Sequence, residues 1–238
     1  MGNLVADTML NHVRELIQKR NSVGSQKAQN LNERRRGGDK RRRKAFVAQP
    51  DATTPIPWVD FAITNSGGIR SGIAKGNVTV ENIMTTSPFG NEVIQFTISG
   101  QELLSTLEAV AIRYHRETQL KVSSFIQVAG LRFVYDSTKV VNHTVGGPAL
   151  LKAEVQDMNK MWRRVAPKTM YSAVSISFVV EGGDNIFAKY DGGRPGGEIL
   201  HGKIDEMLMA RFRSDGCVTP YVDGRIEDVG KPRISEMS

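Results

Sequence analysis

Residues 58–70 read Trp-Val-Asp-Phe-Ala-Ile-Thr-Asn-Ser-Gly-Gly-Ile-Arg. The apolar run from Trp58 to Thr64 predicts a buried strand. The two glycines that follow allow a tight loop and a close approach of the backbone to a ligand. Asn65 adds an amide to this loop, and Arg70 adds a planar guanidinium with several donors. The stretch therefore predicts a core strand that ends in a polar, ligand-binding loop.

A second segment, Ser87-Pro-Phe-Gly-Asn91, places an aromatic residue between two turn formers. Pro88 and Gly90 favour a rigid turn, which would hold Phe89 in a fixed and exposed position. An exposed aromatic ring of this kind can stack on a nucleobase.

A third segment, Phe178-Val-Val-Glu-Gly-Gly-Asp184, repeats the pattern of an aromatic residue followed by a polar turn. The Gly182-Gly183 turn would present the Asp184 carboxylate, which can accept hydrogen bonds from both hydroxyls of a ribose. Each segment also has a structural interpretation. Phe89 and Phe178 could be core residues, and Asp184 could cap a helix.

The rest of the chain mixes helices and strands without regular alternation, which favours an α+β fold. We expect an amphipathic helix over 3–20, a strong helix over 100–116 and a third over 199–212. The expected strands and short helical turns complete the pattern: helical turns at 79–83, and strands at 93–98, 125–128, 131–136, 150–155, 170–180 and 225–226.

The net charge of +7 arises in one short segment. Residues 34–44, Arg-Arg-Arg-Gly-Gly-Asp-Lys-Arg-Arg-Arg-Lys, carry the whole excess, so the remainder of the chain is neutral. Because residues 21–56 show no hydrophobic period, we expect them to form a basic, disordered insertion. The expected organisation is a single domain over 1–238 with this insertion and a short C-terminal tail at 229–238.

Several classes of function lack their motifs. The four histidines have no second ligand at metal-binding spacing, Cys217 has no neighbouring base, and the Gly67–Lys75 stretch departs from a phosphate-binding loop. We therefore expect no catalytic residue, no metal ligand and no bound cofactor in this chain. No apolar run is long enough for a membrane span, and no signal peptide is recognisable.

Five separated motifs together resemble the C-terminal domain of the 5'-nucleotidase and UDP-sugar hydrolase family. They are Gly2–Asp7, Asn65–Arg70, Ser87–Asn91, Phe178–Asp184 and Asp223–Ile226. Two further stretches, 131–136 and 162–171, agree with the same pattern. The resemblance covers residues 2–20 and about 57–228.

This resemblance implies a four-layer α/β/β/α domain with mixed sheets that binds a nucleotide or nucleoside substrate. It implies that Phe89 and Phe178 sandwich the base, while the polar groups bind the base edge, the ribose or the phosphate. The residues implied in binding are Asn65, Gly67, Gly68, Arg70, Phe89, Asn91, Phe178, Gly183 and Asp184.

In this family the chemistry belongs to an N-terminal metallophosphoesterase domain with two divalent metal ions. We expect this chain to lack that domain, so the hydrolase activity of nucleotide catabolism would require the full-length enzyme. Two departures from the family pattern stand out. The arginine that usually precedes Gly2-Asn3-Leu4 is absent, and Asn185-Ile186 replace the usual glycine and aromatic after Asp184.

Two alternatives remain open at this point. The chain could be a nucleotide-binding module without activity, or a nucleic-acid-binding protein that acts through residues 34–44. That segment would bind phosphate backbones without reading sequence, because no aromatic residues are interleaved with its cations. The family is mostly extracytoplasmic or secreted, and Asn77 and Asn142 would be glycosylation acceptors in a secreted eukaryotic protein.

Overall fold

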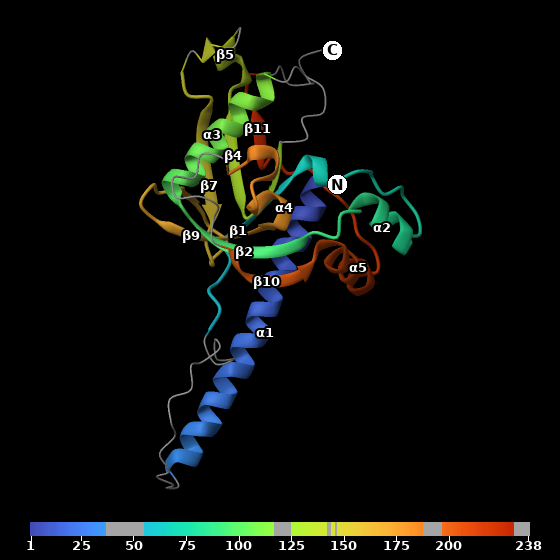
Figure 1. Cartoon of the computed structure of the whole chain (residues 1–238), viewed down its shortest axis with the longest axis vertical. Helices are drawn as coiled ribbons and strands as arrows, with labels where there is room; N and C mark the ends of the chain where they lie inside the picture. The colour runs from blue at the N-terminus through green and yellow to red at the C-terminus, as the bar shows by residue number, and fades with distance from the viewer. Residues whose placement is uncertain (37–54, 117–124, 142–143, 146, 188–196, 231–238) are drawn as a thin grey trace. The chain divides into compact units, whose positions relative to one another are not determined.

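The structure is a computed structural model that describes residues 1–36, 55–116, 125–141, 144–145, 147–187 and 197–230 (Figure 1). The described chain divides into two compact units, one of residues 1–11 and 59–238 and one of residues 12–58. The larger unit contains the helices and strands that surround the predicted site. The C-terminal tail beyond residue 230 lies outside the described residues.

The larger unit contains two mixed sheets. The five-stranded sheet has the order β10-β2-β9-β1-β3, and the four-stranded sheet has the order β11-β4-β7-β8. The strands of the first are β1 (Phe61–Asn65), β2 (Glu92–Ser99), β3 (Ile126–Ala129), β9 (Met170–Ile176) and β10 (Gly197–Lys203). Those of the second are β4 (Leu131–Tyr135), β7 (Leu150–Gln156), β8 (Trp162–Arg164) and β11 (Ile226–Asp228). The predicted α+β class with mixed sheets is confirmed.

The helices of this unit pack against both sheets. Helix α3 (Gly100–Arg116) contacts β7 and β2, while α2 (Val80–Thr86) and α5 (Ile204–Asp215) lie side by side near β10 (Figure 1). Short elements complete the unit: the helical turns η1 (Ser66–Gly68), η2 (Ser137–Lys139), α4 (Ser177–Val180) and η3 (Gly183–Asn185), and the hairpin of β5 (Val140–Val141) and β6 (Thr144–Val145).

Strand directions explain why distant segments meet at one edge of the five-stranded sheet. Strand β9 runs parallel to β1, with Ala62 opposite Val174, so both strands end at the same edge. Strand β2 runs antiparallel to β9, with Val93 opposite Ile176, so β2 begins at that edge. The end of β1, the end of β9 and the start of β2 therefore converge.

Two predicted elements need correction. Residues 170–180 were expected to form one strand, but β9 ends at Ile176 and Ser177–Val180 form a helical turn. Residues 199–212 were expected to be helical, but Gly197–Lys203 form β10 and the helix begins at Ile204. Strand β10 pairs with β2, and this long-range pairing overrides the local helical period.

The smaller unit corrects a third prediction. Helix α1 runs from Gly2 to Arg36, so residues 21–36 are helical and not part of a loop. Many of these residues are polar but intrinsically good helix formers, which explains why hydrophobic periodicity did not reveal the helix. The Asn21 side chain exchanges two 3.1 Å hydrogen bonds with the backbone of Ile56. Residues 37–54, which include most of the basic segment, lie outside the described residues.

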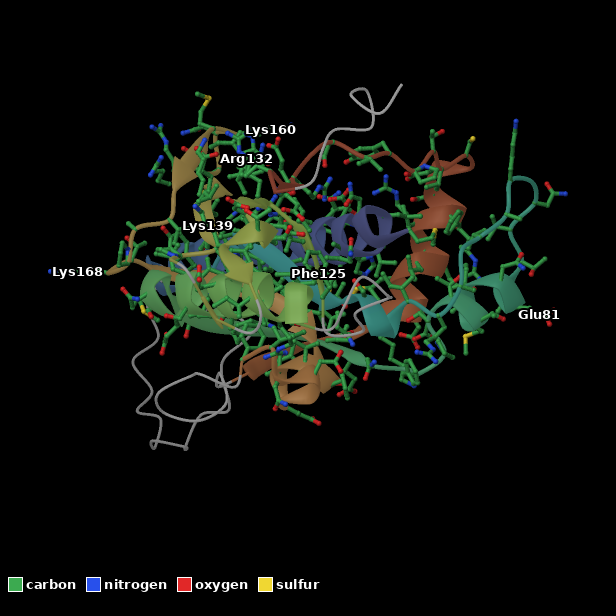
Figure 2. All side chains as sticks on the ribbon, turned by 90° about the horizontal axis from the view of Figure 1, so that it is seen from above. Glu81, Phe125, Arg132, Lys139, Lys160 and Lys168 are labelled. Atoms are coloured by element: carbon green, nitrogen blue, oxygen red, sulfur yellow. The ribbon has the colours of Figure 1, made fainter. Side chains whose placement is uncertain are left out.

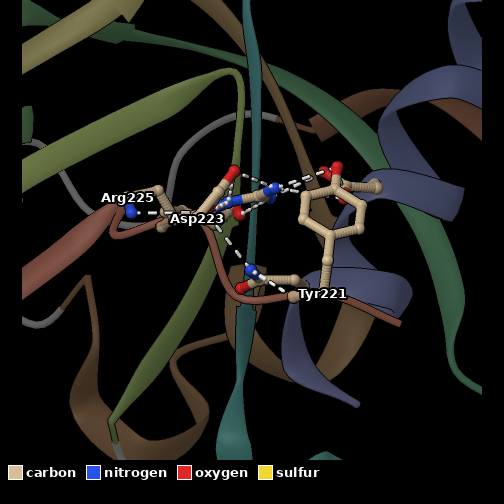
Figure 3. A network of polar contacts seen from close by, with 6 residues as sticks. Tyr221, Asp223 and Arg225 are labelled. Carbon is tan, nitrogen blue, oxygen red and sulfur yellow. Dashed lines mark hydrogen bonds and ion pairs between the residues drawn. The ribbon is translucent and has the colours of Figure 1, made fainter. Parts of the chain in front are cut away.

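A buried ion network joins the start of α1 to the C-terminal segment (Figure 3). Arg225 is 9% exposed and donates to Asp7 at 2.6 Å, to Asp223 at 2.8 Å and to the Val128 carbonyl at 2.8 Å. The Tyr221 hydroxyl also donates to Asp7. This network therefore joins two of the motifs that carry the family resemblance, Gly2–Asp7 and Asp223–Ile226.

The four-stranded sheet carries a cluster in which two cations share one carboxylate. The Arg132 guanidinium lies 4.4 Å from the centre of the Trp162 ring and donates to Glu154 at 2.6 Å. Lys152 pairs with the same carboxylate at 3.0 Å. Figure 2 shows Arg132 and Lys160 on one side of the molecule and Glu81 on the other.

In the part of the chain that the structure describes, no helix is long and apolar enough to cross a membrane.

Candidate substrate-binding site

One cavity, of about 420 Å³, lies at the sheet edge where β1, β2 and β9 converge. Its lining residues are Asn65, Gly67, Gly68, Arg70, Phe89, Asn91, Phe178 and Asp184. These are eight of the nine residues that the sequence predicted for substrate binding. The structure therefore brings the predicted residues together, and their role in binding stays a prediction.

Asn65 forms the buried part of the cavity lining. It is the last residue of β1 and is only 3% exposed. Its amide nitrogen donates a 2.6 Å hydrogen bond to the Asp184 carboxylate, whereas its amide oxygen is buried without a hydrogen-bond partner. A buried acceptor of this kind is costly to leave unpaired, so a donor on a ligand would be favourable here.

Gly68 packs closely against this amide. A Cβ atom at position 68 would lie 2.8 Å from the Asn65 oxygen, closer than carbon and oxygen normally approach. The glycine therefore leaves the Asn65 side chain in place while the loop turns away from β1. This is the close backbone approach that the Gly-Gly pair predicts.

Two exposed phenyl rings form the apolar part of the cavity. Phe89 is 58% exposed in the turn after α2, and Phe178 is 42% exposed in α4. Val179 and Val180, the next residues of α4, are buried. The change from strand to helical turn at Ser177 thus allows two successive valines to enter the core while Phe178 faces outward. Neither ring is a core residue.

Asp184 lies in a strained turn that begins one residue after α4. Gly182, Asp184 and Asn185 all have positive φ angles, at 97°, 53° and 50°. Positive φ is uncommon for residues other than glycine and concentrates at functional sites. The turn directs the Asp184 carboxylate toward Asn65 in the cavity.

Gly183 is the predicted residue that does not line the cavity. A Cβ atom there would lie 2.5 Å from two ring carbons of Phe178. Gly183 therefore lies directly against the ring, and its lack of a side chain lets the turn pack against Phe178. Its predicted part in substrate binding stays a prediction.

Arg70 and Asn91 occupy the cavity rim. Arg70 is exposed, its guanidinium lies 5.8 Å from the centre of the Phe89 ring, and it donates to the Gly67 carbonyl at 3.2 Å. Asn91 accepts hydrogen bonds from Ser177 through its side chain and from the Ile204 amide through its carbonyl. Asn91 thereby ties the start of β2 to α4 and α5.

Sequence reasoning missed Arg113, which is in α3. This arginine donates to the carbonyls of Asp184 and Asn185 at 2.5 and 3.1 Å. Cations are common in the last turns of helices because they interact favourably with the helix dipole. Arg113 therefore did not stand out in the sequence. Only the three-dimensional structure reveals this contact.

The remaining candidates for chemistry do not gather around the cavity. Among the described residues, no group of three or more His, Cys, Asp or Glu side chains could hold a metal ion. Cys217 is exposed, and His201 shares a 2.9 Å hydrogen bond with Gln95. A separate cavity, of about 730 Å³, is lined by residues that include Leu4, Phe212 and Cys217 and by none of the predicted site residues.

The sequence model of a family described as "5'-nucleotidase, C-terminal domain" matches residues 1–190. Among curated proteins, the apyrase of Tabanus yao is 32% identical over 126 residues, which is 53% of this chain and 22% of the apyrase. The trifunctional nucleotide phosphoesterase YfkN of Bacillus subtilis is 28% identical over 174 residues, which is 72% of this chain and 11% of that protein. The chain therefore spans less than a quarter of the length of these relatives.

Solved structures are similar in fold. The crystal structure of a 5'-nucleotidase precursor from Thermus thermophilus superimposes with a TM-score of 0.65 and 23% sequence identity. That match covers 97% of this chain and 35% of the other.

Proposed function

Because this chain belongs to the family of 5'-nucleotidase C-terminal domains, we propose that its 420 Å³ cavity binds the nucleoside part of a nucleotide. The observation that carries the proposal is the gathering of eight predicted residues around one cavity. Small-molecule sites generally have volumes of about 300–1,000 Å³, and this cavity falls within that range.

The two exposed rings of Phe89 and Phe178 are suited to a base. Stacking contributes about 1–3 kcal/mol per base, and it tolerates any base because every base has an aromatic face. Two rings with one or two hydrogen bonds would total about 4–6 kcal/mol, which corresponds to a dissociation constant of about 0.05–1 mM.

The polar groups are suited to the base edge and the sugar. The buried amide oxygen of Asn65 can accept a hydrogen bond from an N–H or O–H group of the ligand. The Asp184 carboxylate can accept hydrogen bonds from ribose hydroxyls while one of its oxygens accepts the hydrogen bond from Asn65. Arg70, exposed at the rim beside Phe89, can bind a ribose or phosphate oxygen.

Phosphate ester hydrolysis belongs to this proposal only as an activity of a full-length enzyme. The family resemblance implies two divalent metal ions in a metallophosphoesterase domain. The residues around the cavity do not fit such a metal centre, because a single carboxylate, Asp184, lines it and no histidine or cysteine does. We therefore assign the cavity to recognition and not to bond cleavage.

A titration of the full chain with adenosine, uridine and guanosine, followed by NMR of the aromatic side chains, tests the proposal. We expect the signals of Phe89 and Phe178 to shift, and we expect the Phe178→Ala substitution to remove the shift of Phe89. Phe212→Ala is the matched control, because it makes the same change at the separate cavity. Nucleosides that shift neither ring at millimolar concentration would refute the proposal.

A further inference from the structure

The turn that carries Asp184 receives two hydrogen bonds from Arg113, a side chain that does not line the cavity. Asp184 and Asn185 both adopt positive φ angles, and this conformation persists only where the surroundings impose it. Arg113 donates to the carbonyls of these same two residues, through Nη1 to Asp184 and through Nη2 to Asn185. One guanidinium therefore binds the two non-glycine residues of the turn that have strained backbones.

Helix α3 holds the backbone of Arg113 in a fixed position. The helix begins with a reciprocal pair in which the Ser99 amide donates to Glu102 and the Glu102 amide donates to the Ser99 hydroxyl. In the middle of the helix, Glu108 accepts from the backbone amides of Ala149 and Leu150 at 2.9 and 2.7 Å. Because the helix is anchored to strand β7, the guanidinium can define the position of the turn.

The Asp184 turn positions two parts of the cavity lining. The Asp184 carboxylate accepts the Asn65 amide at 2.6 Å, and Gly183 lies against the Phe178 ring so closely that no Cβ atom fits between them. A shift of the turn would therefore move the carboxylate and release the ring together. Arg113 itself does not line the cavity.

We infer that Arg113 is a positioning residue for nucleoside binding, which sets the places of Asp184 and Phe178 without contacting the ligand. This inference rests on the proposed function of the cavity. In this inference Asp184 contacts the ribose hydroxyls, and Arg113 holds Asp184 in place.

The test compares Arg113→Met and Arg113→Lys with Arg164→Met in the full chain. Arg164 is an exposed arginine of β8, so its replacement is a matched control for loss of the same charge. The affinities for adenosine and for 2',3'-dideoxyadenosine are measured by calorimetry or NMR titration, together with the thermal midpoint. The dideoxy compound lacks the ribose hydroxyls that would donate hydrogen bonds to Asp184.

We expect Arg113→Met to weaken adenosine binding about tenfold or more, since two charge-assisted hydrogen bonds to the turn are lost. The preference for adenosine over the dideoxy compound should fall toward one. Arg113→Lys should recover part of the preference, because an ammonium can still donate to one carbonyl, and Arg164→Met should match the wild type. Unchanged affinity and preference in Arg113→Met would overturn the inference. So would an equal loss for both ligands that accompanies a lowered thermal midpoint, because Arg113 would then be a general stabilising residue.

Failure of the proposed function is distinguishable from failure of this inference. If the wild type binds neither nucleoside, the proposed function is wrong, and hydrogen exchange of the turn then decides the role of Arg113. The amides of Asn185 and Ile186, which donate within the turn, should exchange faster in Arg113→Met than in the wild type. Equal exchange rates would refute the positioning role.

Discussion

The Asn65 amide donates a 2.6 Å hydrogen bond to the Asp184 carboxylate, which lies 119 residues further along the chain. The bond joins the Gly-rich loop after β1 to the turn after α4, so two motifs that are remote in sequence form one polar surface. The sheet makes the contact possible, because β1 and β9 are parallel and end at the same edge. The two residues are therefore coupled through the stability of the fold.

Asn65→Ala is expected to lower both stability and affinity. The substitution removes the hydrogen bond to Asp184 from a position that is almost fully buried. The loss should be about 1–3 kcal/mol in the free energy of unfolding, with a weaker nucleoside titration. Chemical denaturation and NMR titration of one sample measure both effects. Asp184→Asn keeps the size of the partner side chain, and it should cost less stability because Asp184 is more exposed.

Phe178→Ala should separate binding from stability. Because the ring is 42% exposed, its removal should cost less than about 1.5 kcal/mol, whereas a core phenylalanine replaced by alanine costs about 3–5 kcal/mol. Phe61→Ala is the matched core variant, since Phe61 is fully buried in β1. Denaturant midpoints of both variants decide the question. Equal losses at the two positions would mean that Phe178 is a core residue.

The fold was predictable where local signals were strong. The helix over Gly100–Arg116 has the predicted bounds, because its apolar stripe and the Ser99-Glu102 pair act locally. Ser177–Val180 was misassigned because three apolar residues after a strand read as more strand. The placement of Arg113 and Gly183 could not be predicted, because each depends on a contact that only the folded chain brings about.

Arg225→Met should destabilise the protein strongly. Arg225 is buried between Asp7 and Asp223, so its removal leaves two carboxylates close together without their common partner. Loss of one partner from a buried ion pair costs about 3–5 kcal/mol, and the partial exposure of the Asp223 carboxylate lowers the expected loss to about 2–3 kcal/mol. Arg132→Met is the control, because the Arg132 side chain is 40% exposed and an exposed pair contributes only about 0–1 kcal/mol. Thermal unfolding of the two variants should differ accordingly.

The same network should make stability depend on pH in the acid range. Hydrogen bonds from Arg225 hold the pKa of Asp223 below its ordinary value. A carboxyl group with a depressed pKa in the folded state stabilises the protein above its unfolded pKa, which is about 3.9. That contribution is lost as the pH falls below about 4 toward the folded pKa. Asp223→Asn should therefore flatten the fall of the thermal midpoint on acidification, and an identical fall in both proteins would contradict the assignment.

The two adjacent glycines of the Asp184 turn should fail in different ways when replaced by alanine. Gly182 has a φ angle of 97° and open space where a Cβ atom would lie, so Gly182→Ala should cost about 1 kcal/mol of stability through backbone strain. Gly183 has no such φ angle, but its Cβ atom would collide with the Phe178 ring at 2.5 Å. Gly183→Ala must therefore displace the ring or the turn, and it should weaken nucleoside binding more than Gly182→Ala does. Binding titrations and thermal midpoints of the two variants give the comparison. Equal affinities would show that the ring does not depend on the turn behind it.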